Sequence, residues 1–583
     1  MVAATTKYNI SLDGHVLPSK ELIGGKAWSL CRMKSMGLSV PPAAVITTAA
    51  CLEYLKTGVF PSNLRAEIRD LVAGLEEQTG RQFGGGKPLL LSVRSGAPVS
   101  MPGMMDTVLN LGINGSVEEA LALEMRDAEF ARDTHRRFLS LYADIVLKSS
   151  TPVGVNDQIG AILERLANES KIIPDCPYEQ LFSSVEAVFT SWNSRRAKRY
   201  RKHNKISENL GTAVIIQAMV FGNMDDNSGT GVLFSRNPLS GVKEPYGEYL
   251  NRAQGEDVVS GTCTPEPISA LLEKSPVLYQ ELIRSAEMLE CENADVQDIE
   301  FTIQNSKLFL LQSRAAKRSP EAAVSFAIDM VGEGLINKET ALSRVSSEQV
   351  RTLLRPRLTQ NSDNARFIVA KGESACYGVG LGLVVASADE AERLAGQGQR
   401  VVLARATTSP EDVHGMIASC AVITEQGGST SHAAVVGRAL GVPCIVGCGE
   451  NSLSSLVGQM VTVDATEGVV YEGYLAVEEP NETDDFRLNM LKQWVDEICP
   501  VKVVSCEDSA ASGALNLDDV IGCDDLCIPN GTLQGYESVR GSMIDSGLGV
   551  FNSVEAGVKI LVTKYPLAVA LTVLECRKDI INT

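Results

Sequence analysis

The sequence predicts a multidomain α/β protein, and three observations support this class. The chain has 583 residues, which is too long for a single hydrophobic core. This length suits about three or four domains. Stretches with helical spacing alternate with short apolar runs that are typical of strands. Two blocks rich in such strands, residues 211–314 and 367–477, are separated by a helical segment at 318–355. We therefore expect separate folded units joined by a bridge.

Composition argues against several classes of protein. The net charge of −19 disfavours binding to a nucleic-acid backbone as a main role. No stretch approaches the roughly 20 apolar residues of a membrane span, and the N-terminus lacks the apolar core of a signal peptide, so a cytoplasmic protein is expected. The 14 cysteines form no CxxC pair and only five histidines are present, so a zinc or multi-histidine centre is not expected.

Two N-terminal segments suit phosphate binding. Gly24 and Gly25 allow the backbone to approach a ligand, and Lys26 adds a point charge before an amphipathic helix. The alternative is a loop with a solvated lysine. Further on, an apolar run ends in Arg94, beside a loop of glycines and methionines that suits charge-assisted phosphate recognition. Arg94 could instead pair with an acidic neighbour, with the methionines filling a core.

A largely helical stretch runs from residue 116 to about 201, and a basic run, SRRAKRYRKHNK, stands at its end, at residues 194–205. Most such runs are solvated faces. Because its charge opposes the acidic balance of the chain, contact with an anionic substrate is the alternative.

Residues 298–314 have the pattern of a β-hairpin with an Asn-Ser turn. Asp298, Glu300 and Gln312 alternate with apolar residues and would project from one face, which Arg314 would share. Oxygen ligands on adjacent strands are what Mg²⁺ bound to nucleotide phosphates requires. The alternative is an ordinary amphipathic hairpin.

The stretch from Thr424 to Gly447 carries the strongest candidate for chemistry. A turn with hydroxyl caps, Gly427 to Ser431, precedes an apolar helical pattern, so His432 is expected in the first turn of a helix. Unpaired backbone N–H groups and the helix dipole favour a negative phosphoryl group at that place. The alternative is a capped helix start with an incidental histidine.

Taken together, these segments resemble the pyruvate phosphate dikinase family over roughly residues 15–475. The matching motifs stand in the family's order as Gly24-Gly25-Lys26, Ser92 to Gly96, Ser100 to Thr107, Gln254 to Asp257, Glu300 with Gln312 and Arg314, and Gly427 to His432. The Ser-Met-Pro-Gly-Met-Met form is similar to the dikinase branch rather than to phosphoenolpyruvate synthase or rifampin phosphotransferase.

The resemblance implies an ATP-grasp-like nucleotide-binding domain at 1–325, a helical bridge and linker at 326–366, a swivelling phosphohistidine domain at 367–478 and a small C-terminal domain at 479–583. It implies ATP and Mg²⁺ as cofactors, with hinges at 356–366 and 476–486. The residues expected in catalysis are His432, Thr430, Arg94 and Arg314. Those expected to bind the nucleotide are Lys26, Arg94, Gln217, Met219, Val220, Glu256, Glu300, Gln312 and Arg314, and those expected to hold the metal are Asp298, Glu300 and Gln312.

The C-terminal region departs from the family. The family's phosphoenolpyruvate/pyruvate barrel takes about 250 residues, whereas residues 479–583 resemble only its first strand, helix and second strand, as a truncated remnant. Ile528 to Gly531 replace the family's Arg-Thr-Glu-His, and the segment with its catalytic cysteine is missing. Pro98 and the pair Glu425-Gln426 each stand where arginine is usual. A phosphoryl acceptor other than pyruvate is therefore expected.

The leading hypothesis is an ATP-dependent dikinase-type phosphotransferase that forms phosphohistidine at His432 and releases AMP. It would pass the phosphoryl group to a small-molecule acceptor, and inorganic phosphate is a candidate for the γ-phosphoryl group. A ligase that uses the phosphohistidine to activate a substrate for condensation is the first alternative. A catalytically reduced regulatory or scaffold homologue is the second, although that role would need none of the motif residues. A separate acceptor-site protein and a homodimer are candidate partners.

Overall fold

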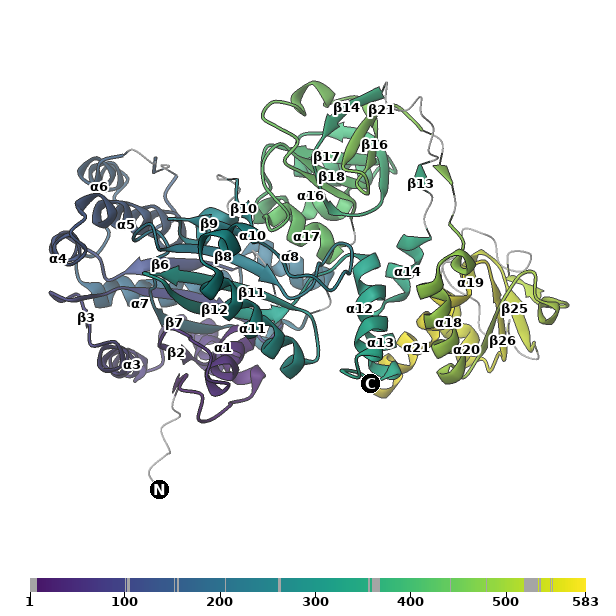
Figure 1. Cartoon of the computed structure of the whole chain (residues 1–583), viewed down its shortest axis with the longest axis horizontal. Helices are drawn as coiled ribbons and strands as arrows, with labels where there is room; N and C mark the ends of the chain where they lie inside the picture. The colour runs from purple at the N-terminus through teal and green to yellow at the C-terminus, as the bar shows by residue number, and fades with distance from the viewer. Residues whose placement is uncertain are drawn as a thin grey trace.

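The computed structural model describes residues 8–99, 101, 105–150, 153–154, 157–204, 206–259, 264–354, 357–358, 367–440, 442–475, 477–478, 480–517, 533, 536–545, 547 and 549–582. They form three bodies (Figure 1). We call them the N-terminal unit (8–317), the histidine unit (367–475) and the C-terminal unit (480–582 with helices α12 to α14). The predicted α/β multidomain class is confirmed, and the exact domain boundaries stay a prediction.

Two five-stranded sheets form the N-terminal unit. The first is antiparallel, in the order β1 (Asn9–Ser11), β2 (Ala43–Ile46), β7 (Ala213–Ala218), β5 (Leu91–Gly96) and β6 (Thr107–Leu111). Successive side chains alternate between its faces, so Ile46 and Ile216 enter one core while Val45 and Ile215 enter another. Helices cover the first face, among them α2 (Thr48–Thr57), α3 (Leu64–Thr79) and α7 (Pro177–Ser191). The other face packs on α1 (Lys20–Ser35) and on the second sheet.

The second sheet holds the predicted hairpin. Its order is β10 (Glu266–Pro267), β9 (Tyr246–Asn251), β8 (Gly229–Phe234), β11 (Gln297–Gln304) and β12 (Lys307–Ala315), with antiparallel neighbours throughout. Asn305 and Ser306 join β11 to β12 with φ angles of 47° and 60°, the left-handed conformation that a two-residue hairpin turn requires. Helix α11 (Pro276–Asn293) packs against this hairpin. The predicted hairpin and its Asn-Ser turn are confirmed.

The predicted helical stretch between residues 116 and 201 is also observed. It comprises α4 (Gly115–Met125), α5 (Ala128–Leu141), a π-helical turn (Tyr142–Val146), α6 (Ile159–Asn168), α7 and α8 (Arg195–His203). The basic run forms α8, but only part of it is a solvated face. Ala197 and Tyr200 are buried in one core with Leu394 and Met416 of the histidine unit.

An eight-stranded mixed sheet forms the histidine unit. The order is β14 (Ile368–Lys371), β21 (Val469–Glu472), β20 (Met460–Asp464), β16 (Val379–Val385), β17 (Val401–Arg405), β18 (Ala421–Thr424), β19 (Cys444–Val446) and β15 (Glu373–Cys376). Strands β16 to β19 run parallel. Helices α15 (Ala388–Ala395), α16 (Val413–Ala418) and α17 (His432–Leu440) pack on one face through a common core. Helix α17 therefore begins at the candidate histidine, as predicted.

The C-terminal unit shares one core with the predicted bridge. Helices α12 (Pro320–Gly332), α13 (Lys338–Arg344) and α14 (Ser347–Leu353) bury Leu342 and Val350 against Leu491, Trp494 and Leu567. The last three lie on α18 (Phe486–Ile498) and α21 (Pro566–Asn582). The helical bridge thus packs as part of this unit (Figure 1).

A four-stranded parallel sheet completes the C-terminal unit. Its order is β23 (Lys502–Ser505), β26 (Ile560–Thr563), β25 (Ser538–Arg540) and β24 (Leu515–Asn516), with α20 (Val550–Glu555) before β26. Strands β26 and β25 lie between β23 and β24, so these two strands are consecutive in the chain but are not neighbours in the sheet. In a barrel of strand–helix units, consecutive strands are neighbours. The proposed replacement at Ile528 to Gly531 lies outside the described residues.

Two chain segments connect the histidine unit to the C-terminal unit. Residues Arg357–Leu358 (β13) pair with Val477–Glu478 (β22) as a short antiparallel ladder between the two bodies (Figure 1). The predicted hinges, 356–366 and 476–486, include these two strands, although residues 356, 359–366, 476 and 479 lie outside the described residues. Within the part of the chain described above, no helix is long and apolar enough to span a membrane.

Candidate active site

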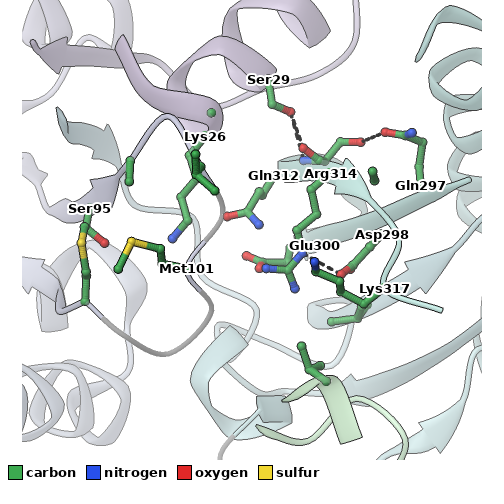
Figure 2. Close-up of a pocket in the computed structure, with 18 of the residues that line it drawn as sticks. Lys26, Ser29, Ser95, Met101, Gln297, Asp298, Glu300, Gln312, Arg314 and Lys317 are labelled. Carbon is green, nitrogen blue, oxygen red and sulfur yellow. Dashed lines mark hydrogen bonds and ion pairs between the residues drawn. The ribbon is translucent and has the colours of Figure 1, made fainter. Parts of the chain in front are cut away.

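A cavity of about 900 Å³ lies where the N-terminal unit faces the histidine unit. Its walls come from α1, the loop after β5, β8, the β11–β12 hairpin and two loops with the start of α17. Seven predicted site residues line it: Lys26, Asp298, Glu300, Gln312, Arg314, Thr430 and His432. Figure 2 shows Lys26 on one side and Glu300, Gln312 and Arg314 opposite. Residues far apart in sequence thus share one chamber.

A break in helix α1 places Lys26 in the wall. Gly24 has a φ of 76° and a ψ of 161°, and a Cβ there would lie 1.8 Å from the carbonyl oxygen of Gly96. Only glycine permits this close approach of α1 to the end of β5. The Gly25 amide donates a 2.9 Å hydrogen bond to the Ala97 carbonyl, so the helix restarts at the cavity. Burial, and next the charge of Arg94, lower the pKa of Lys26 to about 7, although Glu300 opposes them.

Charged side chains of three strands interlock beside Lys26. Arg94 on β5 donates to Glu300 on β11 at 2.8 Å, and Arg314 on β12 donates to Asp298 at 2.7 Å. Asp298 stands opposite Arg314 in the hairpin, and Glu300 opposite Gln312. Burial raises the pKa of Glu300, but Arg94, Arg314 and Lys26 outweigh it and hold that pKa below its usual value. Glu300 is therefore a carboxylate at neutral pH.

The hairpin also presents oxygens that suit a divalent cation. Asp298 Oδ1 and Gln312 Oε1 are buried and have no hydrogen-bond partner among the described residues. Glu300 lines the cavity next to them. Carboxylate and amide oxygens are the donors that Mg²⁺ prefers, and two acceptors without donors are what a cation would satisfy. The predicted metal residues therefore fit the ion.

His432 opens helix α17 at the opposite wall. Its Nδ1 lies 3.2 Å from the Thr408 hydroxyl, which fixes the ring, while its Nε2 is buried and meets no hydrogen-bond partner within the described part of the chain. Burial lowers the pKa of His432 to about 4, against the influence of Asp412 and with a smaller contribution from Arg196. The imidazole is therefore neutral at physiological pH, the form in which a ring nitrogen is a nucleophile.

The loop before His432 is held by a residue that the sequence did not single out. Glu248 on β9, in the N-terminal unit, accepts hydrogen bonds from the hydroxyls of Ser429, at 2.8 Å, and Thr430. A Cβ at Gly428 would lie 2.6 Å from Glu248 Oε1, so the glycine makes room for this carboxylate. The sequence did not identify Glu248 because this residue lies in an ordinary strand pattern. Its partners are seen only where the two units pack together.

Further pairs join the two units around this loop. Tyr246 on β9 donates to Glu373 at 3.1 Å, and Arg196 on α8 forms a 3.2 Å ion pair with Glu411. Arg438 on α17 donates to the Ser429 carbonyl at 2.8 Å and lies over the Phe234 ring of β8. The basic run therefore contributes docking contacts through α8.

Several predicted nucleotide residues lie away from the cavity lining. Gln217 is buried, and its amide donates to the Pro41 carbonyl at 3.4 Å. Met219 packs against the first-sheet core, and Val220 follows it. Glu256 pairs with Arg137 at 2.8 Å. The cavity thus does not gather these four with the other predicted residues, and their role stays a prediction.

Part of the methionine loop lies outside the described residues, namely Ser100 and residues 102–104. Met101, Met105 and Thr107 line the cavity, and so does Pro98. Glu425 is engaged within its own unit, where its carboxylate accepts the Leu453 amide at 3.2 Å. Of the two positions that differ from the family pattern, Pro98 therefore touches the cavity directly.

Comparisons with known proteins match both units of this site. Residues 53–282 match the family described as "Pyruvate phosphate dikinase, AMP/ATP-binding domain", and residues 397–468 match "PEP-utilising enzyme, mobile domain". Pyruvate, phosphate dikinase 2 of Zea mays is 42% identical over 533 residues, covering 84% of this chain and 60% of that protein. Pyruvate, phosphate dikinase 1 of Arabidopsis thaliana is 42% identical over 528 residues, with 84% and 54% covered.

A bacterial relative gives the same result. Pyruvate, phosphate dikinase of Rhizobium meliloti is 40% identical over 533 residues, covering 82% of this chain and 58% of that protein. The chain thus spans somewhat more than half the length of the curated relatives it matches.

Proposed function

The chain belongs to the pyruvate, phosphate dikinase family, and from this premise we propose that it transfers a phosphoryl group from ATP to His432. The observation that carries the proposal is the position of His432 Nε2, which is buried and has no hydrogen-bond partner among the described residues. It lies in the cavity that also contains Lys26 and the oxygen-rich hairpin. A neutral, ring-fixed imidazole facing a phosphate-binding wall is suited to nucleophilic attack on phosphorus.

In the proposed step, the lone pair of His432 Nε2 attacks the β-phosphorus of ATP. The Nε2–P bond forms, the bridging P–O bond to the α-phosphate breaks, and its electron pair leaves with AMP. This step leaves a pyrophosphoryl group on Nε2. An oxygen of inorganic phosphate then attacks the γ-phosphorus and the P–O bond between the β- and γ-phosphates breaks. Its electron pair stays with the phosphohistidine, and pyrophosphate leaves. A proton on Nδ1, donated to Thr408, would keep the lone pair on Nε2.

The residues of the wall would align and neutralise the phosphate chain. Lys26 and Arg314 line the cavity. Arg94 does not line it, but its hydrogen bond holds Glu300 in place. Asp298, Glu300 and Gln312 would hold Mg²⁺, which supplies positive charge to the transferred group when bound. Thr430, tied to Glu248, would set the position of the histidine loop. These roles account for the predicted catalytic and metal residues.

The final acceptor is the finer part of the proposal. The sequence favoured an acceptor other than pyruvate, whereas the names of the curated relatives give pyruvate and phosphate for those proteins. Those names lend no support to a different acceptor. Cytoplasmic location, a homodimer and a separate acceptor-site protein likewise stay predictions.

Labelled ATP tests the first step. With ATP labelled at the β-phosphate, the protein should acquire one acid-labile, alkali-stable label, and His432→Ala should acquire none. His414→Ala is a matched control, since His414 lies in the same unit and contacts Asp389 at its surface. Label that persists in His432→Ala would overturn the proposal. Absence of label from the unaltered chain would also overturn it and would favour a scaffold role.

The acceptor can then be separated from the carrier step. Chase of the labelled protein with pyruvate should release label as phosphoenolpyruvate if the chain completes the reaction of its relatives. AMP formation that requires two added substrates would instead indicate ligation. Retained label with every small acceptor would point to transfer to a separate protein.

A further inference from the structure

The cations that line the cavity fall into two groups. The arginines have carboxylate partners: Arg314 pairs with Asp298 at 2.7 Å, Arg32 with Glu292 at 2.7 Å and Arg344 with Asp295 at 3.5 Å. Lys317 lines the same cavity, but it forms no ion pair or hydrogen bond with any side chain in the described ranges. Lys26 and the exposed Lys20 also line the cavity and are alike in this respect.

The backbone around Lys317 is firmly anchored. Its neighbour Ala316 is buried and donates its amide to the Val296 carbonyl at 2.8 Å. On the other side, Arg318 donates to Asp295 at 2.8 Å, and Ser319 caps helix α12. Lys317 is thereby fixed between strand β12 and α12. In Figure 2 it lies on the far side of Glu300 from Lys26, beside Asp298.

The surroundings of Lys317 are positive. Burial, and then the charges of Arg314 and Arg318, lower the pKa of this lysine. A partly buried ammonium beside two guanidinium groups is unfavourable unless an anion compensates it. The nearby carboxylates Asp298 and Asp295 each pair with an arginine, and neither forms an ion pair with Lys317 in the described ranges. An anionic ligand entering the cavity would complete the set.

We infer that Lys317 is a phosphate-binding residue. Lys317 and Lys26 lie on opposite sides of the Glu300–Arg314 cluster, and together they bind the polyphosphate chain of the nucleotide. The inference rests on the proposed function, and it adds a contact that the motifs did not identify. An ammonium on each side of the chain would hold the β-phosphorus in line with His432 Nε2 while the oxygen-rich hairpin binds the cation.

Two substitutions separate charge from shape. Lys317→Met keeps the length of the side chain and removes its charge, whereas Lys317→Arg keeps the charge. The control is Lys307→Met, because Lys307 is an exposed residue at the start of the same strand. Each full-length variant is titrated by calorimetry with Mg²⁺ and the β,γ-imido analogue of ATP, and its thermal unfolding midpoint is measured without ligand.

Lys317→Met should weaken binding of the analogue about tenfold or more, as expected for loss of a charge-assisted hydrogen bond. Lys317→Arg should restore most of the affinity, and Lys307→Met should bind as the unaltered chain does. Without ligand, Lys317→Met should be at least as stable as the unaltered chain, because it removes an uncompensated charge. A purely structural lysine would give the opposite stability result.

Affinity that is unchanged in Lys317→Met would overturn the inference, as would a lower unfolding midpoint with no specific loss of binding. Failure of the proposed function is distinguishable. In that case the unaltered chain binds the analogue, with the same dependence on Lys317, but takes no label from ATP at His432. A chain that binds no nucleotide would contradict both.

Discussion

At the scale of single residues, His432 shows how burial prepares a nucleophile. The ring is fixed through Nδ1 by Thr408, and Nε2 is left without a partner in the described structure. Its pKa of about 4 follows mainly from burial. An exposed histidine would be partly protonated near neutral pH, and its nitrogen would then be unavailable for attack. Burial also has a cost, because the buried imidazole resists protonation at low pH.

That cost predicts an acid sensitivity. The folded pKa lies below the ordinary value of about 6.5, so the unfolded chain binds the proton more readily. The contribution of neutral His432 to the free energy of unfolding is therefore complete above about pH 6.5, and it is lost as the pH falls toward 4. When the pH is lowered from 7 to 5, the free energy of unfolding of the histidine unit should fall by about 1–2 kcal/mol more in the unaltered chain than in His432→Asn. Pulse proteolysis in urea measures the difference.

The exposed His203 provides the control for this measurement. His203→Asn should keep the acid sensitivity of the unaltered chain. Equal acid sensitivity in the unaltered chain and in His432→Asn would contradict the burial argument.

At the scale of elements, the break in α1 decides where Lys26 points. The predicted glycine pair does more than loosen a loop, since Gly24 interrupts one helix and brings it onto the end of β5. Two strands of the first sheet and the hairpin of the second then meet the restarted helix around one chamber. The site is thus formed where several elements of the two sheets and helix α1 meet.

Gly24→Ala tests this junction. The new Cβ would overlap the Gly96 carbonyl, and the φ of 76° is unfavourable for alanine, so the free energy of unfolding should fall by about 3 kcal/mol or more. Gly74→Ala is the matched control, because Gly74 lies inside helix α3 with nothing within 4 Å of the added Cβ. It should stabilise the chain by roughly 0.5–1 kcal/mol. Chemical denaturation measures both, and similar effects of the two changes would refute the argument.

At the scale of the whole molecule, docking of the histidine unit completes the cavity. The N-terminal unit supplies Lys26 and the hairpin, and the histidine unit supplies Thr430 and His432. Glu248 of the N-terminal unit contacts the loop before His432 directly, through the hydroxyls of Ser429 and Thr430. The chain passes between the histidine unit and the C-terminal unit twice, and the paired strands β13 and β22 lie on these two connections (Figure 1). Two narrow connections suit the predicted swivelling.

Glu248→Ala should therefore affect the carrier more than the nucleotide. It removes the acceptor of two hydroxyls but lies outside the cavity lining. Labelling of His432 at saturating ATP should slow about tenfold or more, while binding of the imido analogue changes little. Glu248→Gln, which keeps an acceptor oxygen, should recover part of the rate, and the exposed Glu244→Ala should behave as the unaltered chain. Weaker analogue binding without slower labelling would count against this role.

The sequence anticipated those parts of the site that depend on local order. Glycine next to lysine, arginine at a strand end, the alternating hairpin and a histidine after a capped turn each follow from propensity and spacing. It did not identify Glu248 or Lys317, because neither lies in a distinctive pattern. It also separated the bridge from the C-terminal residues, although Leu342 and Leu491 share a core. Apolar periodicity shows that a helix has a buried face but not what covers it.

By itself, the sequence determined the α/β class, the hairpin with its Asn-Ser turn and the start of the helix at His432. These features depend on side chains a few residues apart, whose geometry the backbone fixes. Only the tertiary structure decided which residues share the cavity, which carboxylate holds the histidine loop, and that Lys317 faces the cavity without an ion-pair partner among the described residues. Those properties depend on the packing of separate units, since burial and the absence of a counter-ion arise only when distant segments meet.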